Sequence, residues 1–294
     1  MGAVLGSFSV IDAMSSEILA ASQIDRLLAI MARLRDPVAG CPWDVEQSFR
    51  TIAHHTIEES YEVVDAIERD DLPALRSELG DLLFQVVFHS QIAREMGAFD
   101  FSAVAAAICD KMVSRHPHVF GDVQVADAAA QTMRWEDHKA AERAAEAAVN
   151  GRVPSALDGV ILGLPGLTRA LKLQKRAARV GFDWIETIDI LDKIEEEVGE
   201  LRVELRAMAD QVVPSRAVHD RVADELGDLL FVLVNLARRL DVDPEGAIRG
   251  ANAKFERRFH RIETLLALQN RAPPDASLEE MEALWQQAKR EERT

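Results

Sequence analysis

An acidic pattern occurs twice in this chain, and it constrains the fold more than any other sequence feature. The first copy reads EESYE at residues 58–62 and ELGDLLF at 78–84, and the second reads EEVGE at 196–200 and ELGDLLF at 225–231. A single Glu-x-x-Glu is usually solvated helix surface. Recurrence of the whole pattern with the same acid spacing instead indicates two similar structural units in which the acids have a similar role.

Each acidic segment borders an apolar helical stripe. In the second copy, apolar residues recur at steps of three and four, as expected for one helix face. They are Leu191, Ile194, Val198, Leu201 and Leu205 on one helix, and Val222, Leu226, Leu229, Leu233 and Leu236 on the next. At about 100° per residue, Glu197 and Glu200 lie on the flank of the first stripe, and Glu225 and Asp228 on the flank of the second. Packing the stripes together brings four carboxylates close, which favours a hard divalent cation between them.

Helical periodicity dominates the chain and convincing period-two strands are absent, so we predict an all-α fold. A length of 294 residues allows two domains. We expect an N-terminal extension at 1–22, a first repeat domain at 23–149, a Gly- and Pro-rich linker at 150–165, and a second, mainly catalytic domain at 166–294.

Capping residues and breakers place the expected helices along the chain. They are Gln23–Arg35, Ser48–Arg69, Leu75–Met96, Phe101–Arg115, Gln131–Val149, Leu167–Val180, one from Thr187, Arg221–Arg239, Pro244–Leu268 and one from Leu278. Proline and glycine predict turns at 36–42 and 116–122.

Charge and composition exclude several functional classes. The net charge of −16 argues against electrostatic capture of nucleic acid or of an anionic membrane. No apolar run is long enough for a membrane span. Cys41 and Cys109 lack C-x-x-C spacing, so they indicate neither a zinc site nor a disulfide framework, and they favour a reducing, cytoplasmic location.

Further motifs accompany the acidic pattern: CPWD at 41–44, HPHVFGD at 116–122 and KFERRF at 254–259. With these motifs, the chain resembles the MazG family of nucleoside triphosphate pyrophosphohydrolases from Ile24 to Arg293, in its tandem-repeat bacterial form. The resemblance implies two tandem MazG-like helical repeats, an acidic helix pair in each, and dimeric helical-bundle sites. It also implies Mg²⁺-dependent hydrolysis of nucleoside triphosphates to a monophosphate and pyrophosphate, for broad-specificity house-cleaning or nucleotide-pool control, with Mn²⁺ as an alternative metal.

Site residues carried over from the family fall into three groups. The implied metal ligands are Glu197, Glu200, Glu225 and Asp228. The implied substrate-binding residues are Lys193, Asn235, Lys254, Arg258, Trp285 and Lys289. A second, N-terminal site would use Glu59, Glu62, Glu78, Asp81, Lys111 and Arg115. Lys193 lies one turn before Glu197, where it either holds a phosphate or pairs with that glutamate.

The two repeats differ where a substrate would be handled. His55 stands at the position of Lys193, and Phe88 at the position of Asn235. These differences remove a positive charge and a hydrogen-bonding side chain from the first repeat. We therefore expect the C-terminal repeat to be the main catalyst, and the N-terminal repeat to be weaker, differently specific or regulatory.

Other functions share parts of this pattern. A di-iron bundle needs Glu-x-x-His motifs, which none of the eight histidines provides. A non-catalytic helical protein that binds a metal or a nucleotide for regulation is the main alternative. Within the enzymes, a narrower dUTP/dCTP or phosphoribosyl-ATP pyrophosphohydrolase would have the same acidic core.

Overall fold

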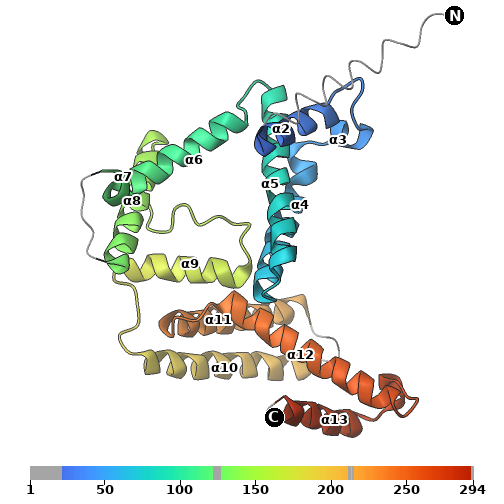
Figure 1. Ribbon diagram of the computed structural model, residues 1–294. Coiled ribbons are helices and arrows are strands. Elements are labelled where there is room, and N and C mark those ends of the chain that lie inside the picture. Colours follow the sequence, from blue (N-terminus) through green and yellow to red (C-terminus); the bar gives the residue numbers. More distant parts are fainter. Residues whose placement is uncertain (1–21, 122–126, 211–212, 214, 293–294) are drawn as a thin grey trace, which may run out of the picture. The chain divides into compact units, whose positions relative to one another are not determined.

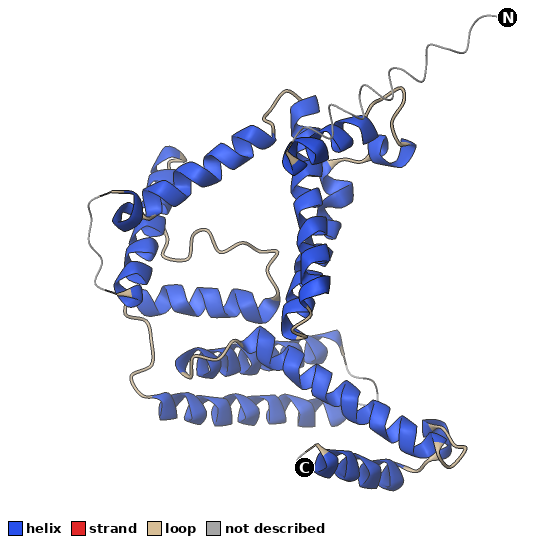
Figure 2. Ribbon diagram, in the orientation of Figure 1, coloured by secondary structure: helices blue, strands red, loops and turns tan. Residues whose placement is uncertain are grey.

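Every regular element in the described part of the chain is a helix, as the computed structural model shows (Figures 1 and 2). The structure describes residues 22–121, 127–210, 213 and 215–292. The prediction of an all-α fold is confirmed. The expected N-terminal extension falls outside these residues except for Ser22, which caps the first described helix.

None of the described helices combines the length and the apolar character needed to cross a membrane.

The chain divides into two compact units, Met1–Trp135 and Glu136–Thr294. We call them the N-terminal and C-terminal units. Their boundary falls inside helix α8 (Ala128–Val149), upstream of the linker expected at residues 150–165. Each unit contains one copy of the acidic pattern, so the repeat in the sequence corresponds to a repeat in the structure.

The N-terminal unit is built on a pair of long helices. Its elements are α2 (Gln23–Leu34), α3 (Pro42–Glu46), α4 (Phe49–Glu68), α5 (Leu72–Glu95), α6 (Phe101–Arg115) and α7 (Pro117–Phe120). Helices α4 and α5 pack along each other, and α2 covers α5. Ser48 caps α4 and Asp71 caps α5 through side-chain oxygens that accept backbone N–H bonds.

Apolar side chains fill the space between α2, α4 and α5. Met31, Ile52, Val87, Phe88 and Ile92 form the buried cluster. Beside it, Arg35 Nη1 donates to the carbonyl of Asp44 at 2.5 Å and to that of Gln47 at 3.2 Å, and its Nη2 lies 2.6 Å from Glu95 Oε2. These bonds hold the CPWD segment against the core.

The C-terminal unit repeats this arrangement with different helices. Its elements after α8 are α9 (Gly166–Arg179), α10 (Thr187–Ala209), α11 (Arg216–Arg239), α12 (Pro244–Ala267), the 3₁₀ turn η1 (Pro273–Asp275) and α13 (Leu278–Glu291). Helices α10 and α11 form the long pair, α9 packs on α11, and α13 packs on α12. The segment preceding α9 is attached to it, because Arg176 Nη1 donates to the carbonyl of Asp158 at 3.1 Å.

Several helix boundaries differ from those expected. Helix α5 begins at Leu72 instead of Leu75, because Asp71 caps it and a proline is compatible with a first helical turn. Helix α11 begins at Arg216 instead of Arg221, and α8 at Ala128 instead of Gln131. The short helix α3 begins at the last residue of the first expected turn, and α7 lies inside the second; each has proline in its first turn.

Candidate active site

The acids of the second repeat meet where α10 and α11 pack together. One carboxylate oxygen from each of Glu197, Glu225 and Asp228 lies within 4.8 Å of the others. Glu200 is outside this close group, but its charge acts on Glu225. The structure therefore brings three of the four implied metal ligands together and places the fourth at the edge.

Glu197 is the buried member of this group. Its exposed fraction is 4%, whereas the sequence placed it on the flank of an apolar stripe. Lys193 Nζ lies 2.7 Å from one carboxylate oxygen, Oε1. The other oxygen, Oε2, is buried and has no hydrogen-bond partner. A buried oxygen without a partner is unfavourable, so a cation shared with Glu225 and Asp228 fits this arrangement.

The charges in the group favour the same ligand. Burial raises the pKa of Glu225, and the neighbouring charges of Glu200 and Glu197 raise it further. The pKa of Lys193 is also raised, mainly because its ammonium hydrogen-bonds to Glu197 and, to a smaller extent, because it hydrogen-bonds to Glu196. Lys193 offsets only part of the negative charge. The all-oxygen donor set that remains is the kind that Mg²⁺ prefers.

Lys193 pairs with Glu197 in this structure, so its removal should destabilise the metal-free protein. We expect Lys193→Met to lower the free energy of unfolding by about 1–3 kcal/mol, less than a fully buried pair would give because the lysine is 27% exposed. Added Mg²⁺ should recover part of the loss, because it supplies positive charge to Glu197. Urea denaturation with and without Mg²⁺ measures this, with the exposed Lys172→Met as control; an equal loss in the control would contradict it.

A cavity of about 570 Å³ lies in the C-terminal unit beside helix α11. Most of its wall is apolar, and the side chains that shape it include Leu173, Ala177, Phe182, Trp184, Phe231 and Asn235. Cavities of roughly 300–1,000 Å³ are typical of small-molecule sites. Phe231 follows Asp228 by one helical turn, so α11 carries both an acidic ligand and the cavity wall.

Asn235 lies in this wall, as its assignment to substrate binding requires. Its Oδ1 accepts a bond from Arg238 Nη2 at 2.8 Å, and Arg238 in turn pairs with Asp183. Sequence reasoning did not assign Phe182, Trp184 or Phe231 to the site. The signal available was an aromatic pair directly after a glycine that ends a helix.

The remaining implied substrate residues gather on α12 and α13. The guanidinium of Arg258 lies 5.4 Å from the centre of the Trp285 ring, and its Nη2 is 2.7 Å from Glu292 Oε2. Lys254 is exposed on α12, and Lys289 is half-buried one turn after Trp285. These residues form a second, basic and aromatic group. Within the described residues no hydrogen bond or ion pair joins it to the acids of α10 and α11.

The acids of the first repeat also converge. Glu59 on α4 and Glu78 and Asp81 on α5 each place one oxygen within 4.8 Å of the others. The pKa of Glu59 is raised by burial and, to a smaller extent, by the charge of Asp81. The pKa of Glu78 is also raised, mainly by burial. The charge of Glu62 also raises the pKa of both glutamates. A shared proton is one way to relieve such crowding, and a cation is another.

The basic residues implied for this first site lie on α6. Lys111 is exposed, and Arg115 is half-buried with its carbonyl accepting a bond from Gln131 Nε2 at 3.1 Å. At the position of Lys193, His55 pairs with Glu58 through Nδ1 at 2.8 Å. The first acidic group therefore lacks the pairing of a lysine with a buried glutamate that the second group has.

Comparison with known families matches both acidic helix pairs. The model of the MazG nucleotide pyrophosphohydrolase domain matches residues 47–120, which span α4 to α7, and residues 186–262, which span α10 and α11 and most of α12. The chain belongs to the MazG family. The resemblance seen in the sequence is thus confirmed, and so is the assignment to the nucleotide pyrophosphohydrolase enzymes.

MazG relatives extend over nearly the whole chain. The chain is 51% identical over 272 residues to a nucleoside triphosphate pyrophosphohydrolase of Escherichia coli (strain K12), covering 92% of this chain and 98% of the relative. It is 39% identical over 266 residues to the nucleoside triphosphate pyrophosphohydrolase/pyrophosphatase MazG of Thermotoga maritima, covering 90% of this chain and 95% of that one. Family membership favours the enzyme over the non-catalytic regulatory alternative.

Proposed function

We propose that this protein hydrolyses nucleoside triphosphates to nucleoside monophosphates and pyrophosphate, with Mg²⁺ held by Glu197, Glu225 and Asp228 and with Glu200 at the edge. Mn²⁺ is the alternative metal. The observation that carries this proposal is the buried, partnerless Oε2 of Glu197 within a group of three carboxylates. The names of the relatives from Escherichia coli and Thermotoga maritima support the same reaction.

The residues present account for the parts that such a reaction needs. When bound, Mg²⁺ would take oxygen ligands from both the carboxylates and the substrate phosphates and neutralise the charge of the phosphates. It would also lower the pKa of a bound water that can attack the α-phosphorus. Lys193 binds one oxygen of Glu197 and leaves the other, buried oxygen without a partner, so that oxygen would be available to the metal. The apolar cavity beside Phe231 would hold the base and exclude water from it, and the amide N–H groups of Asn235 could hydrogen-bond the nucleoside.

The basic and aromatic group on α12 and α13 would bind the rest of the nucleotide. Lys254 offers a point charge and Arg258 a planar, bidentate donor for phosphate oxygens. Phosphate binding to Arg258 would replace its ion pair with Glu292. Trp285 and Lys289 lie next to this position and would contact the nucleotide edge.

A homodimer is proposed because the apolar stripes of α10 and α11 stay partly exposed in one chain. The exposed side chains on them are Leu191, Val198, Leu205, Leu226 and Leu233, and Leu230 is exposed next to the stripe of α11. Covering such a surface commonly requires a second copy. Light scattering should give twice the 32.6 kDa chain mass, and Leu230→Asp should give a monomer with lower activity. Val149→Asp, at an exposed site on α8, is the control. An active wild-type monomer would contradict this prediction.

The C-terminal repeat is proposed as the main catalyst on structural grounds as well. Phe88, at the position of Asn235, is 1% exposed and belongs to the core of the N-terminal unit, where Trp43 and Phe84 contact it. The position that matches Asn235 is therefore packed into the core of the N-terminal unit, whereas Asn235 itself lines a cavity. The N-terminal acids would bind a metal in a weaker, differently specific or regulatory unit.

Location and partners complete the proposal. We expect a cytoplasmic enzyme that acts on free nucleotides and binds neither nucleic acid nor a membrane, because its net charge of −16 opposes capture by polyanions. Local basic residues and the metal would then be needed for a triphosphate to approach.

A panel of the eight common ribo- and deoxyribonucleoside triphosphates tests the function. We expect Mg²⁺-dependent release of pyrophosphate from several of them, because the cavity wall is apolar and offers few groups that discriminate among bases. Activity confined to dUTP and dCTP would reduce the proposal to a narrower enzyme. Release of no pyrophosphate from any member of the panel would overturn it in favour of a binding protein.

A further inference from the structure

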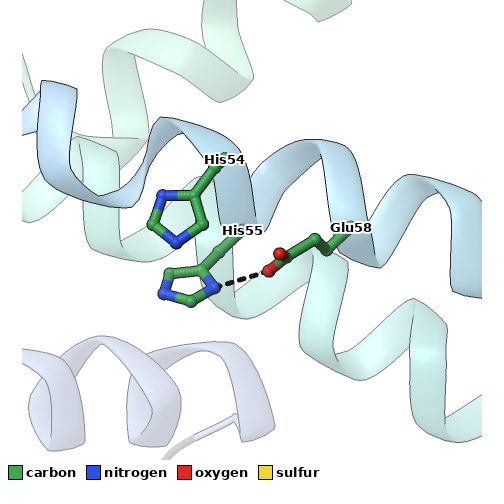
Figure 3. Close-up of side chains that lie close together, drawn as sticks. All are labelled: His54, His55 and Glu58. Atoms are coloured by element: carbon green, nitrogen blue, oxygen red, sulfur yellow. Dashed lines mark hydrogen bonds and ion pairs between the residues drawn. The ribbon is translucent and has the colours of Figure 1, made fainter.

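Two histidines and a glutamate gather on one face of α4 in the N-terminal unit, as Figure 3 shows. His54, His55 and Glu58 each offer one ligand atom, and these three atoms lie within 4.8 Å of one another. The group is separate from the neighbouring acids Glu59, Glu78 and Asp81, which contain no nitrogen donor. The function proposed above uses none of its members.

The positions of the two imidazole rings are unusual for neighbouring helical residues. Successive side chains on a helix diverge by about 100°, yet the ring centroids of His54 and His55 are 3.9 Å apart. His55 Nδ1 also lies 2.8 Å from Glu58 Oε2, one turn further along the helix. Trp43 approaches the ring of His55 with a centroid separation of 6.4 Å, so the indole helps to position the imidazole.

We propose that His54, His55 and Glu58 form a site for a borderline transition-metal cation such as Zn²⁺. Two imidazole nitrogens and a carboxylate oxygen are a donor set that suits Zn²⁺, Co²⁺ and Ni²⁺, in contrast to the all-oxygen groups on α4–α5 and α10–α11. The cation would replace the hydrogen bond between His55 and Glu58 and take its remaining ligands from water. His54 and Glu58 are exposed and His55 is partly exposed, so a cation can reach all three.

The second copy of the sequence repeat lacks this set of metal-binding residues and so serves as a comparison. In the second copy, the positions of His54, His55 and Glu58 are occupied by Asp192, Lys193 and Glu196. There the ammonium of Lys193 pairs with Glu196 at 2.9 Å, where a cation would have to bind. A lysine is thus compatible with this helical position and incompatible with a metal, which makes His55→Lys a well-matched test substitution.

Calorimetric titration of Zn²⁺ into the full-length protein tests the proposal, with Mg²⁺ in excess to occupy the all-oxygen groups. The expected result is Zn²⁺ binding to a high-affinity site that weakens by at least about tenfold in His54→Ala and in His55→Lys. His260→Ala, which removes an exposed histidine from α12, should leave the affinity unchanged. Circular dichroism checks that each variant keeps its helices.

Tryptophan fluorescence locates the bound ion. Co²⁺ and Ni²⁺ quench nearby indoles, so part of the emission should be lost on titration, and Trp43→Phe should remove that part. The proposal is overturned if the protein binds no Zn²⁺ beyond its Mg²⁺-saturated sites. It is equally overturned if the His54→Ala, His55→Lys double variant keeps the wild-type affinity, or if quenching persists without Trp43.

Discussion

Replacing Glu197 with glutamine is expected to lower the turnover of nucleoside triphosphates by at least about a hundredfold. Glutamine preserves the length and the shape of the side chain, and its amide can still form hydrogen bonds. It removes the charge that Lys193 now balances and that a cation would share with Glu225 and Asp228. Asp228→Asn should act in the same direction. Both effects are measured as pyrophosphate release across a range of Mg²⁺ concentrations.

The loss of turnover should not come from loss of structure. Removing the charge of Glu197 weakens its pairing with Lys193, but it also relieves repulsion with Glu225, and Lys193 keeps Glu196 as a partner. The helical signal should therefore stay intact. Glu195→Gln is the matched control, because Glu195 is an exposed glutamate on the same helix. Rates close to wild type in Glu197→Gln at moderate Mg²⁺ would show that the metal assignment is wrong.

Glu225→Ala is expected to give an almost inactive full-length enzyme, whereas Glu78→Ala should keep most of its activity. The two glutamates occupy matching positions in the two repeats. Only Glu225 lies in the unit in which Lys193 pairs with the buried Glu197 and in which α11 lines a cavity. Losing one charged contact typically costs about 1.5–3 kcal/mol, or roughly ten- to a hundredfold in rate or affinity.

This pair of variants separates the two repeats within one protein. Steady-state rates at saturating Mg²⁺ are the measurement, and the equal helical content of both variants is the control. If Glu78→Ala is the inactive enzyme and Glu225→Ala works, the catalytic repeat has been assigned backwards. The chemistry of the acidic helix pair would then stand, but the significance given to Lys193 and Asn235 would not.

Helical periodicity explains why much of this arrangement could be predicted from the sequence. Residues three apart on a helix share a face, so the spacing of Glu225 and Asp228 already placed them together. The apolar stripes predicted which helices would pack. The close approach of Glu197 to both acids follows from these two facts, because the stripes of α10 and α11 meet beside the acids.

Features that depend on long-range packing were not predictable in the same way. The burial of Glu197 arises only once α11 covers it, and helical spacing gives no depth below the surface. The cavity needs α9, α11 and the aromatic residues after Gly181, which are distant in sequence. The sequence also could not decide whether Lys193 contacts a phosphate or Glu197. A lysine one helical turn before Glu197 can reach that carboxylate or a ligand bound beside it.

The substitution of Phe88 for Asn235 shows how a correct sequence observation acquires its physical meaning. From sequence, it was the loss of a hydrogen-bonding side chain. In the structure, Phe88 is a central member of the hydrophobic core of the N-terminal unit, with Met31, Ile52 and Ile92 around it. Apolar packing thus replaces a cavity wall, which is a stronger difference between the repeats than the loss of one hydrogen bond.

Hydrolysis of a nucleoside triphosphate in ¹⁸O-labelled water tests the central claim most directly. If water attacks the α-phosphorus at the second acidic pair, the label should appear in the monophosphate, with an equal amount of unlabelled pyrophosphate. Product formation should cease when EDTA removes the metal, and it should be nearly absent in Glu197→Gln. Label in pyrophosphate or inorganic phosphate, or hydrolysis unaffected by EDTA, would contradict this account.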